Sequence, residues 1–243
     1  MAGLPPQFRP RDETEAYTAQ RAAHGLLSSS GYGTRAGWKI GCTTAVMQAY
    51  LGVENPCAGG MFLAHVWRGS HTFATGEPPR LGAECEIAVR IAHDLPGGRR
   101  AYELADVADA VAACMPAIEV VENRYVDYAS IGTPTLIADD FFHHSAVLGR
   151  EDERCDPRRL RDATATMEVN GQLVGTGRGT DVMGEPLEAL RWLANRAVEF
   201  GVPVRAGEVV LLGSLVETQW ARPGDVFKGH NDMLGAVSAA FEE

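Results

Sequence analysis

The sequence predicts an α+β fold, in which a helical N-terminal region leads into a strand-rich mixed core. Near the N-terminus, apolar and small residues recur at helical spacing, whereas alternating and β-branched runs dominate after about residue 80. Helices and strands do not alternate regularly, which argues against a doubly wound sheet. We therefore expect a helical region at residues 1–75 and a core at residues 76–243, together forming one structural unit.

The bulk composition is typical of a soluble globular protein. Of 243 residues, 45% are hydrophobic and 22% are charged, which is enough to build a sizeable core. The formal net charge of −10, with no run of Lys or Arg, argues against nucleic-acid binding. The sequence shows neither a signal-peptide pattern at its N-terminus nor an apolar window long enough to span a membrane. Five cysteines without a Cys-x-x-Cys pair predict reduced thiols, and we expect a cytoplasmic protein.

In the N-terminal region, residues 13–29 have the spacing of a helix, and residues 37–41 are short enough to be a strand or an extended turn. Thr43 or Thr44 can cap a second helix. We expect that helix to bury a stripe composed of Val46, Met47, Tyr50 and Leu51. Residues 52–60 contain a proline and several glycines and are predicted to form a loop.

In the core, residues 81–92 alternate as a strand that places Cys85, Ile87, Val89 and Ile91 on one face. Asn170-Gly171 predicts a hairpin turn, and Pro186 is typical of the start of a helix that ends at Gly201. The remaining predicted elements are a helix at 103–114 broken by Pro116, strands at 117–121, 208–212 and 236–241, and a charged loop at 150–161.

Three glutamates are the most informative residues. Glu84 and Glu86 alternate on one strand, so they point the same way about 6.6 Å apart. Glu119 is a lone acid in a β-branched run. Three carboxylates of this kind suit a hard divalent cation such as Mg²⁺. Alternation alone is equally typical of a strand with one wet face, and Glu119 could face water on an edge strand.

Two further positions are candidates for handling a substrate. Lys39 lies between Trp38 and Ile40, with glycines on both sides that allow a ligand to approach the backbone. An amine in apolar surroundings can take part in proton transfer, although lysines are mostly exposed and Lys39 could lie in a surface turn. Ser214 follows a buried strand, where a hydroxyl and backbone N–H groups can hold an anion, or where the chain simply turns.

Two other motifs are weaker. Residues 175–179 are rich in glycine but lack the spacing and the lysine of a phosphate-binding loop, so we do not predict a nucleotide site. His143 and His144 are adjacent and point to opposite sides of a strand, which argues against a shared metal. The segment that contains them could still reach a pocket from a loop or strand end.

Five stretches, taken in order, resemble one family. They span nearly the whole chain, from about residue 15 to residue 241, and they are specific together although each alone is weak. The sequence is similar to the 2-keto-4-pentenoate hydratases and the related 4-oxalocrotonate decarboxylases of the fumarylacetoacetate hydrolase superfamily. The stretches are residues 37–43, 84–88, 116–124, 184–187 with 192–195, and 206–210 with 213–216.

The resemblance implies a mixed β-roll core and assembly as a homo-oligomer. It implies that Glu84, Glu86 and Glu119 hold Mg²⁺ or Mn²⁺, that Lys39 handles protons and that Ser214 lies in the substrate pocket. The substrate class it implies is a small 2-oxo or 2-hydroxydienoic acid from aromatic catabolism. The expected reaction adds water to a 2-hydroxypenta-2,4-dienoate-type acid to give a 4-hydroxy-2-oxo acid.

The chain departs from the family pattern at two positions. Cys57 stands where the hydratases carry an Asp, and Asp139-Asp140 stands where they carry Asp-Asn. These changes keep two alternatives open: a metal-dependent 2-oxo-acid decarboxylase of the 4-oxalocrotonate type, and a non-catalytic partner subunit of such an enzyme.

Overall fold

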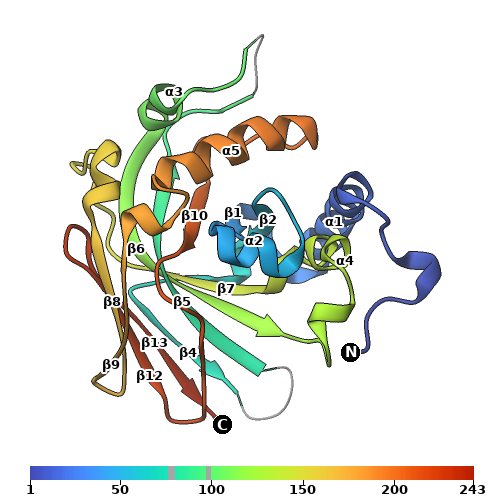
Figure 1. The fold of residues 1–243 in the computed structure, drawn as a ribbon. Helices are drawn as coiled ribbons and strands as arrows, with labels where there is room; N and C mark the ends of the chain where they lie inside the picture. Colours follow the sequence, from blue (N-terminus) through green and yellow to red (C-terminus); the bar gives the residue numbers. More distant parts are fainter. Residues whose placement is uncertain (76–79, 97–99) are drawn as a thin grey trace.

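Two mixed β-sheets form the body of the protein, and helices cover the upper part of the molecule (Figure 1). The computed structural model describes residues 1–75, 80–96 and 100–243. The strands are β1 (Arg35–Gly41), β2 (Cys57–Phe62), β3 (Val66–Arg68), β4 (Ser70–Ala74), β5 (Arg80–Ile91), β6 (Val111–Asn123), β7 (His143–Leu148), β8 (Thr164–Val169), β9 (Gln172–Arg178), β10 (Val209–Ser214), β11 (Gln219–Trp220), β12 (Val226–Asn231) and β13 (Gly235–Glu242). The helices are α1 (Glu13–Leu27), α2 (Ala45–Leu51), α3 (Leu104–Asp109), α4 (Thr133–Ala138) and α5 (Pro186–Glu199).

The larger sheet runs in the order β2-β1-β10-β5-β6-β7-β3, with β11 added beside β5. The smaller sheet runs β4-β13-β12-β8-β9 and lies below the long curved strands β5 and β6 (Figure 1). Their facing apolar side chains form the main core, which includes Ile118, Phe227 and Phe241. This arrangement confirms the predicted α+β class with a mixed sheet core.

The N-terminal region contributes strands as well as helices. The strands β1 to β4 all come from residues 35–74, and β1 pairs with β10 from the far end of the chain. The loop expected at 52–60 therefore gives way to β2 at Cys57, where six consecutive buried residues pair with β1. The boundary proposed at residue 76 lies outside the described residues, and the division of the chain there stays a prediction.

Most of the predicted elements are confirmed. The helices α1 and α5, the strands β1, β5, β10 and β13, and the β8–β9 hairpin lie where the sequence places them. In that hairpin, Asn170 and Gly171 both have positive φ, as a type I′ turn requires. Thr44 caps α2 by accepting a hydrogen bond from the Met47 N–H.

Two predictions, one about packing and one about the extent of a helix, were wrong. The apolar stripe expected on α2 is exposed at Val46, Met47 and Tyr50, because this short helix stands off the core beside a cavity. The helix predicted for 103–114 ends at Asp109, and β6 runs from Val111 straight through Pro116, which pairs with Ile87. Pairing with β5 along its whole length outweighs the break that proline would otherwise cause.

No helix in the described part of the chain has the length and apolarity needed to cross a membrane.

Candidate metal and substrate site

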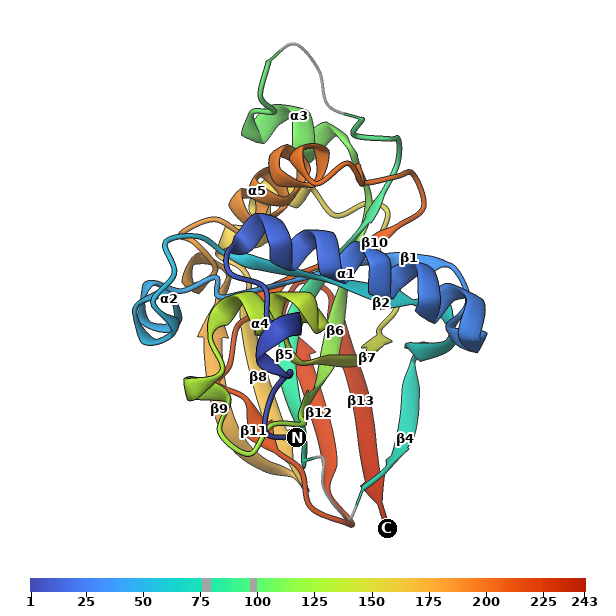
Figure 2. The same ribbon diagram turned by 90° about the vertical axis from the view of Figure 1, so that its right-hand side faces the viewer.

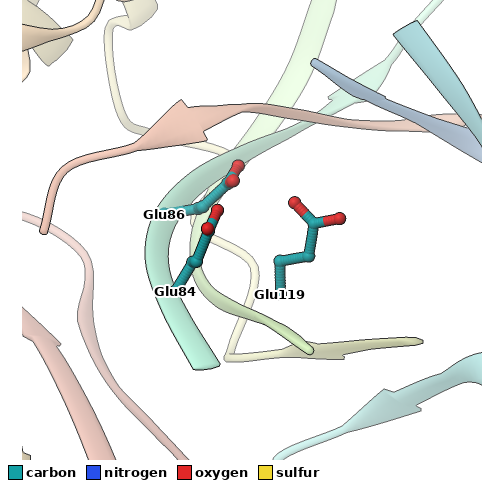
Figure 3. A group of neighbouring side chains, drawn as sticks. All are labelled: Glu84, Glu86 and Glu119. Carbon is teal, nitrogen blue, oxygen red and sulfur yellow. The ribbon is translucent and has the colours of Figure 1, made fainter. Parts of the chain in front are cut away.

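The three glutamates converge at the centre of the larger sheet. Antiparallel pairing of β5 with β6 places Glu84 directly opposite Glu119, and Glu86 lies two residues further on the same face of β5. One carboxylate oxygen from each residue lies within 4.8 Å of the others. Figure 3 shows the three side chains turned toward a common point. The strand β6 lies between β5 and β7, and Glu86 and Glu119 are each 1% exposed, so neither solvent-facing alternative holds.

This carboxylate cluster fits a divalent cation on electrostatic grounds. Burial, followed by repulsion from Glu119, raises the pKa of Glu84 to about 7. Burial and the charges of Glu119 and Glu84 also raise the pKa of Glu86 well above its ordinary value. The Oε1 atom of Glu86 is buried without a hydrogen-bond partner among the described residues. A dipositive ion would neutralise the mutual repulsion and satisfy that oxygen.

Glu119 is held differently from its two neighbours. Burial opposes its ionisation, but the Lys39 ammonium and a hydrogen bond to His143 together keep its pKa below the ordinary value. Lys39 Nζ lies 3.5 Å from Glu119 Oε1, and His143 Nδ1 lies 2.8 Å from the same atom. Both contacts fall on one oxygen, which leaves Oε2 available as a ligand atom.

Lys39 is buried rather than placed in a surface turn. It is 2% exposed, and its ammonium donates a hydrogen bond to the Phe141 carbonyl and lies 4.9 Å from the centre of the Phe141 ring. The strand β1 positions it, paired with Gly59 on β2 and Leu211 on β10. The lysine therefore lies beside the carboxylate cluster, within ion-pair distance of Glu119.

An unusual turn delivers the groups that contact Lys39 and Glu119. Asp140, Phe141 and Phe142 all have positive φ, which side-chain-bearing residues seldom adopt. The turn is held by Asp140, whose Oδ1 accepts a hydrogen bond from the Gly60 N–H and lies 2.7 Å from His24 Nε2. A β-carbon at Gly59 would lie 2.5 Å from the Asp140 carbonyl oxygen, so this close approach requires glycine.

A cavity of about 550 Å³ opens onto the cluster. Lys39 and Glu84 are among its polar lining residues, and Ser214 also lines it. The wall is largely apolar, with Val46, Met47, Leu51, Val121, Tyr128, Phe141, Phe142, Leu215, Val216 and Trp220. The arrangement can hold a small acid whose polar end reaches the carboxylate cluster while its remainder contacts apolar side chains.

Ser214 lies in this cavity, but its neighbouring groups are already engaged. The Ser214 hydroxyl donates to the Val216 carbonyl at 2.6 Å. The Gly213 N–H donates to Glu86 Oε2 at 2.9 Å, and the Leu215 N–H donates to the Cys85 carbonyl. These two amides thus hold the carboxylate cluster and the sheet, and Ser214 offers a ligand chiefly its acceptor oxygen.

Comparison with known proteins places the chain in a family. Residues 64–242 match the model of the fumarylacetoacetate (FAA) hydrolase C-terminal family. The chain belongs to this family. It is 32% identical over 232 residues to a 2-keto-4-pentenoate hydratase of Paraburkholderia phymatum, covering 96% of this chain and 87% of that protein. It is 36% identical over 217 residues to a 2-hydroxyhexa-2,4-dienoate hydratase of Comamonas testosteroni, covering 85% and 78% of the two chains.

A solved structure of the same family is also similar. The 4-oxalocrotonate decarboxylase of Pseudomonas putida G7, complexed with magnesium and adipate, superposes with a TM-score of 0.90 at 26% identity. The match covers 99% of this chain and 90% of the decarboxylase. The chain is thus a member of the hydratase and decarboxylase branch of the fumarylacetoacetate hydrolase superfamily.

Sequence reasoning missed several groups that complete this family member's site. His143 is the first residue of β7, as predicted for a strand end, but its contact with Glu119 carried no signal in the sequence. Thr218 donates a hydrogen bond to Glu84 and carried no recognisable signal. Gly213 combines a φ of 119° with the amide that holds Glu86, and a β-carbon there would lie 2.5 Å from the Thr43 hydroxyl oxygen. The signal that could have identified Gly213 was its position at the end of a buried strand.

The two departures from the family pattern lie beside the site. The Asp140 carboxylate contacts His24 and the Gly60 N–H and anchors the turn. Cys57 is 1% exposed at the start of β2, opposite Gly41, so it lies close to Cys42, the residue that follows β1.

Proposed function

We propose that this protein is a divalent-metal-dependent hydratase that converts a 2-hydroxypenta-2,4-dienoate-type acid into a 4-hydroxy-2-oxo acid. The observation that carries the proposal is the meeting of Glu84, Glu86 and Glu119 with Lys39 at the end of one apolar-walled cavity. The named hydratases that share about a third of their residues with this chain support the same reaction class.

We assign the three carboxylates as ligands of Mg²⁺ or Mn²⁺ and Lys39 as the proton-transferring residue. A bound cation would supply Lewis-acid stabilisation of negative charge on the substrate's 2-oxygen. Lys39 would transfer the 2-hydroxyl proton to C5, which converts the dienol into a conjugated ketone. Water then adds across C3 and C4, with its hydroxyl on C4 and its proton on C3. Glu119 and the Phe141 carbonyl hold the lysine in place for this transfer.

The charge of the cavity favours hydration over decarboxylation of a dicarboxylic acid. Among the described residues that line it, Lys39 alone is basic, whereas Glu84, Asp181 and Glu217 are acidic. A substrate with a second carboxylate would place that group against apolar or acidic side chains, which is unfavourable without a cation. A dienoate with a hydrogen or a small alkyl group at its far end has no such cost.

The experiment is a spectrophotometric assay of the purified protein with Mg²⁺ and the dienoate. We expect the ultraviolet absorbance of the dienoate to fall and EDTA to prevent the fall. An unchanged absorbance with Mg²⁺ present contradicts the hydratase proposal. The non-catalytic partner role, suggested by Cys57, is tested separately: loss of turnover in the isolated Glu84→Gln variant would rule it out.

A 2-oxo-acid decarboxylase is the second candidate, favoured by the structural similarity to 4-oxalocrotonate decarboxylase. Release of CO₂ from 2-oxo-3-hexenedioate, without hydration of the shorter dienoate, would select it. We further infer a cytoplasmic homo-oligomer, on the strength of the family resemblance. Light scattering of the purified protein tests the oligomeric state, and a monomer would contradict it.

A further inference from the structure

A pair of cysteine thiols lies at the edge of the catalytic cavity and has no part in the chemistry described above. Cys57 begins β2 and pairs with Gly41, the last residue of β1, so Cys42 directly follows the residue opposite Cys57. These strands lie side by side in both views (Figures 1 and 2). Spacings of about 5 Å across and 3.3 Å along a sheet place the two Cα atoms about 6 Å apart. A disulfide needs a Cα separation of roughly 4.4–6.8 Å.

The backbone turns the two thiols toward each other. Cys42 has a φ of 55°, which breaks the alternation that would otherwise send its side chain to the opposite face. Each thiol shifts the pKa of the other, and both are free thiols in this structure. The hydrogen bond from Cys57, against the effect of burial and together with the Lys39 charge, holds the pKa of Cys42 below its ordinary value. A thiol of this kind is the more nucleophilic member of a pair.

The thiols can be reached from two sides. Cys42 lines the catalytic cavity with Lys39 and Glu84. Cys57 lines a second cavity of about 420 Å³, and Leu51 lies in the wall that the two cavities share. A small oxidant therefore has access to the pair although each cysteine is less than 10% exposed.

Cys42 is also connected to the carboxylate cluster through its neighbour in the chain. The Thr43 side chain packs directly against Gly213, and the Gly213 N–H holds Glu86. The Thr43 carbonyl accepts a hydrogen bond from the Met183 N–H, which fixes the other side of this segment. A displacement of Cys42 would thus be passed to the amide that positions Glu86.

We propose that Cys42 and Cys57 form a peroxide-sensitive dithiol site whose oxidation to a disulfide reversibly inactivates the enzyme. The Cys42 sulfur attacks one peroxide oxygen, the O–O bond breaks, and Cys42 sulfenic acid and one water form. The Cys57 sulfur then attacks the Cys42 sulfur, the S–S bond forms, the S–O bond breaks, and a second water leaves with the Cys57 proton. Two thiols and one hydrogen peroxide thereby give one disulfide and two waters.

A second cysteine pair in the chain supplies a matched control. Cys114 and Cys155 also interact, but they lie outside the catalytic cavity, on β6 and in the charged loop. The double variant Cys114→Ser with Cys155→Ser removes this pair and leaves Cys42 and Cys57 intact.

The test treats the Mg²⁺-loaded protein with hydrogen peroxide and maps its peptides before and after dithiothreitol. We expect a cross-linked peptide joining Cys42 to Cys57, a drop of at least tenfold in both turnover and Mg²⁺ affinity, and recovery of both with dithiothreitol. The Cys114→Ser, Cys155→Ser variant should behave in the same way. Cys57→Ser should give no cross-linked peptide, and its Cys42 should pass to sulfinic acid that dithiothreitol does not reduce.

Two results would overturn the proposal. One is oxidation of Cys42 in the unmodified chain without any Cys42–Cys57 cross-link. The other is formation of the cross-link with turnover and Mg²⁺ affinity unchanged. The peptide map and the Mg²⁺ affinity do not depend on which reaction the enzyme catalyses, so failure here is distinguishable from failure of the hydratase proposal.

Discussion

The floor and the mouth of the catalytic cavity are built on opposite principles. The floor consists of acids and one lysine fixed on paired strands at the centre of the larger sheet, where Glu86 and Glu119 are almost fully buried. The mouth includes α2, whose apolar residues Val46 and Met47 are 77% and 42% exposed. The floor of this cavity therefore holds buried charges, and its rim holds exposed apolar side chains.

This contrast between buried charges and exposed apolar side chains indicates which part of the site carries the chemistry. Buried like charges are costly, and they persist where a ligand or a counter-charge compensates them. Exposed apolar side chains beside a cavity cost much less and can contact an apolar part of a substrate. Changes to the floor should therefore affect catalysis strongly, and changes to the mouth should affect it weakly.

The largest effect is expected at the carboxylate cluster. Glu84→Gln removes a charge that we assign to metal binding, and we expect turnover of the dienoate to fall by at least about a thousandfold. Glu217→Gln is the matched control, because Glu217 lines the same cavity but lies outside the cluster. Retained turnover in Glu84→Gln, or equal losses in the two variants, would break the distinction between floor and mouth.

The second effect is expected at Lys39. Lys39→Met keeps most of the buried volume and removes the proton donor, so kcat at saturating Mg²⁺ should fall about 10²- to 10⁴-fold. Mg²⁺ should still bind, since the three carboxylates remain. A variant that turns over normally once enough Mg²⁺ is added would show that the lysine serves only to neutralise Glu119.

His143 should have an intermediate effect that appears in metal binding. His143→Phe keeps a ring but loses the hydrogen bond to Glu119 Oε1. We expect Mg²⁺ affinity, measured by calorimetric titration, to weaken by roughly 10- to 100-fold. His144→Phe is the control, because His144 contacts Ser145 instead. Unchanged affinity in His143→Phe would remove this histidine from the account of the site.

The smallest effect is expected at the mouth. Met47→Gln keeps the helix and replaces an exposed apolar side chain, so the free energy of unfolding should change by less than about 0.5 kcal/mol. KM for the dienoate should rise by less than about tenfold, with kcat retained. A loss of stability of several kcal/mol would mean that α2 is a core helix after all.

The floor could be predicted from the sequence because its acidic residues follow the two-residue repeat of a strand. A two-residue repeat sets Glu84 and Glu86 on one face, and an acid inside an apolar run marks Glu119 as unusual. The pairing of Glu84 with Glu119 was beyond reach, since register depends on contacts between distant segments. Resemblance to a family supplied that link.

Other features of the site and the fold could not be predicted from the sequence, for physical reasons that differ from residue to residue. His143 pairs with Val121 on β6, two residues from Glu119 and on the same face, and that register depends on contacts between distant segments. The α2 stripe has the spacing of a buried helix face, but spacing does not reveal whether a partner surface exists. Because proline lacks an N–H, Pro116 alone predicts an interruption of regular structure. Only the pairing with β5 shows that the strand continues.

The most direct test of the central claim is a titration of the metal-free protein with Mn²⁺, followed by electron paramagnetic resonance at pH 8. Glu84, with a pKa near 7, is mostly ionised there. Below that pH, proton uptake competes with the ion, and binding should weaken as the pH falls to 6. We predict one tightly bound ion per chain, lost when Glu84, Glu86 and Glu119 are all replaced by Gln. No tight binding by the unmodified protein, or equal binding by the triple variant, would contradict the account.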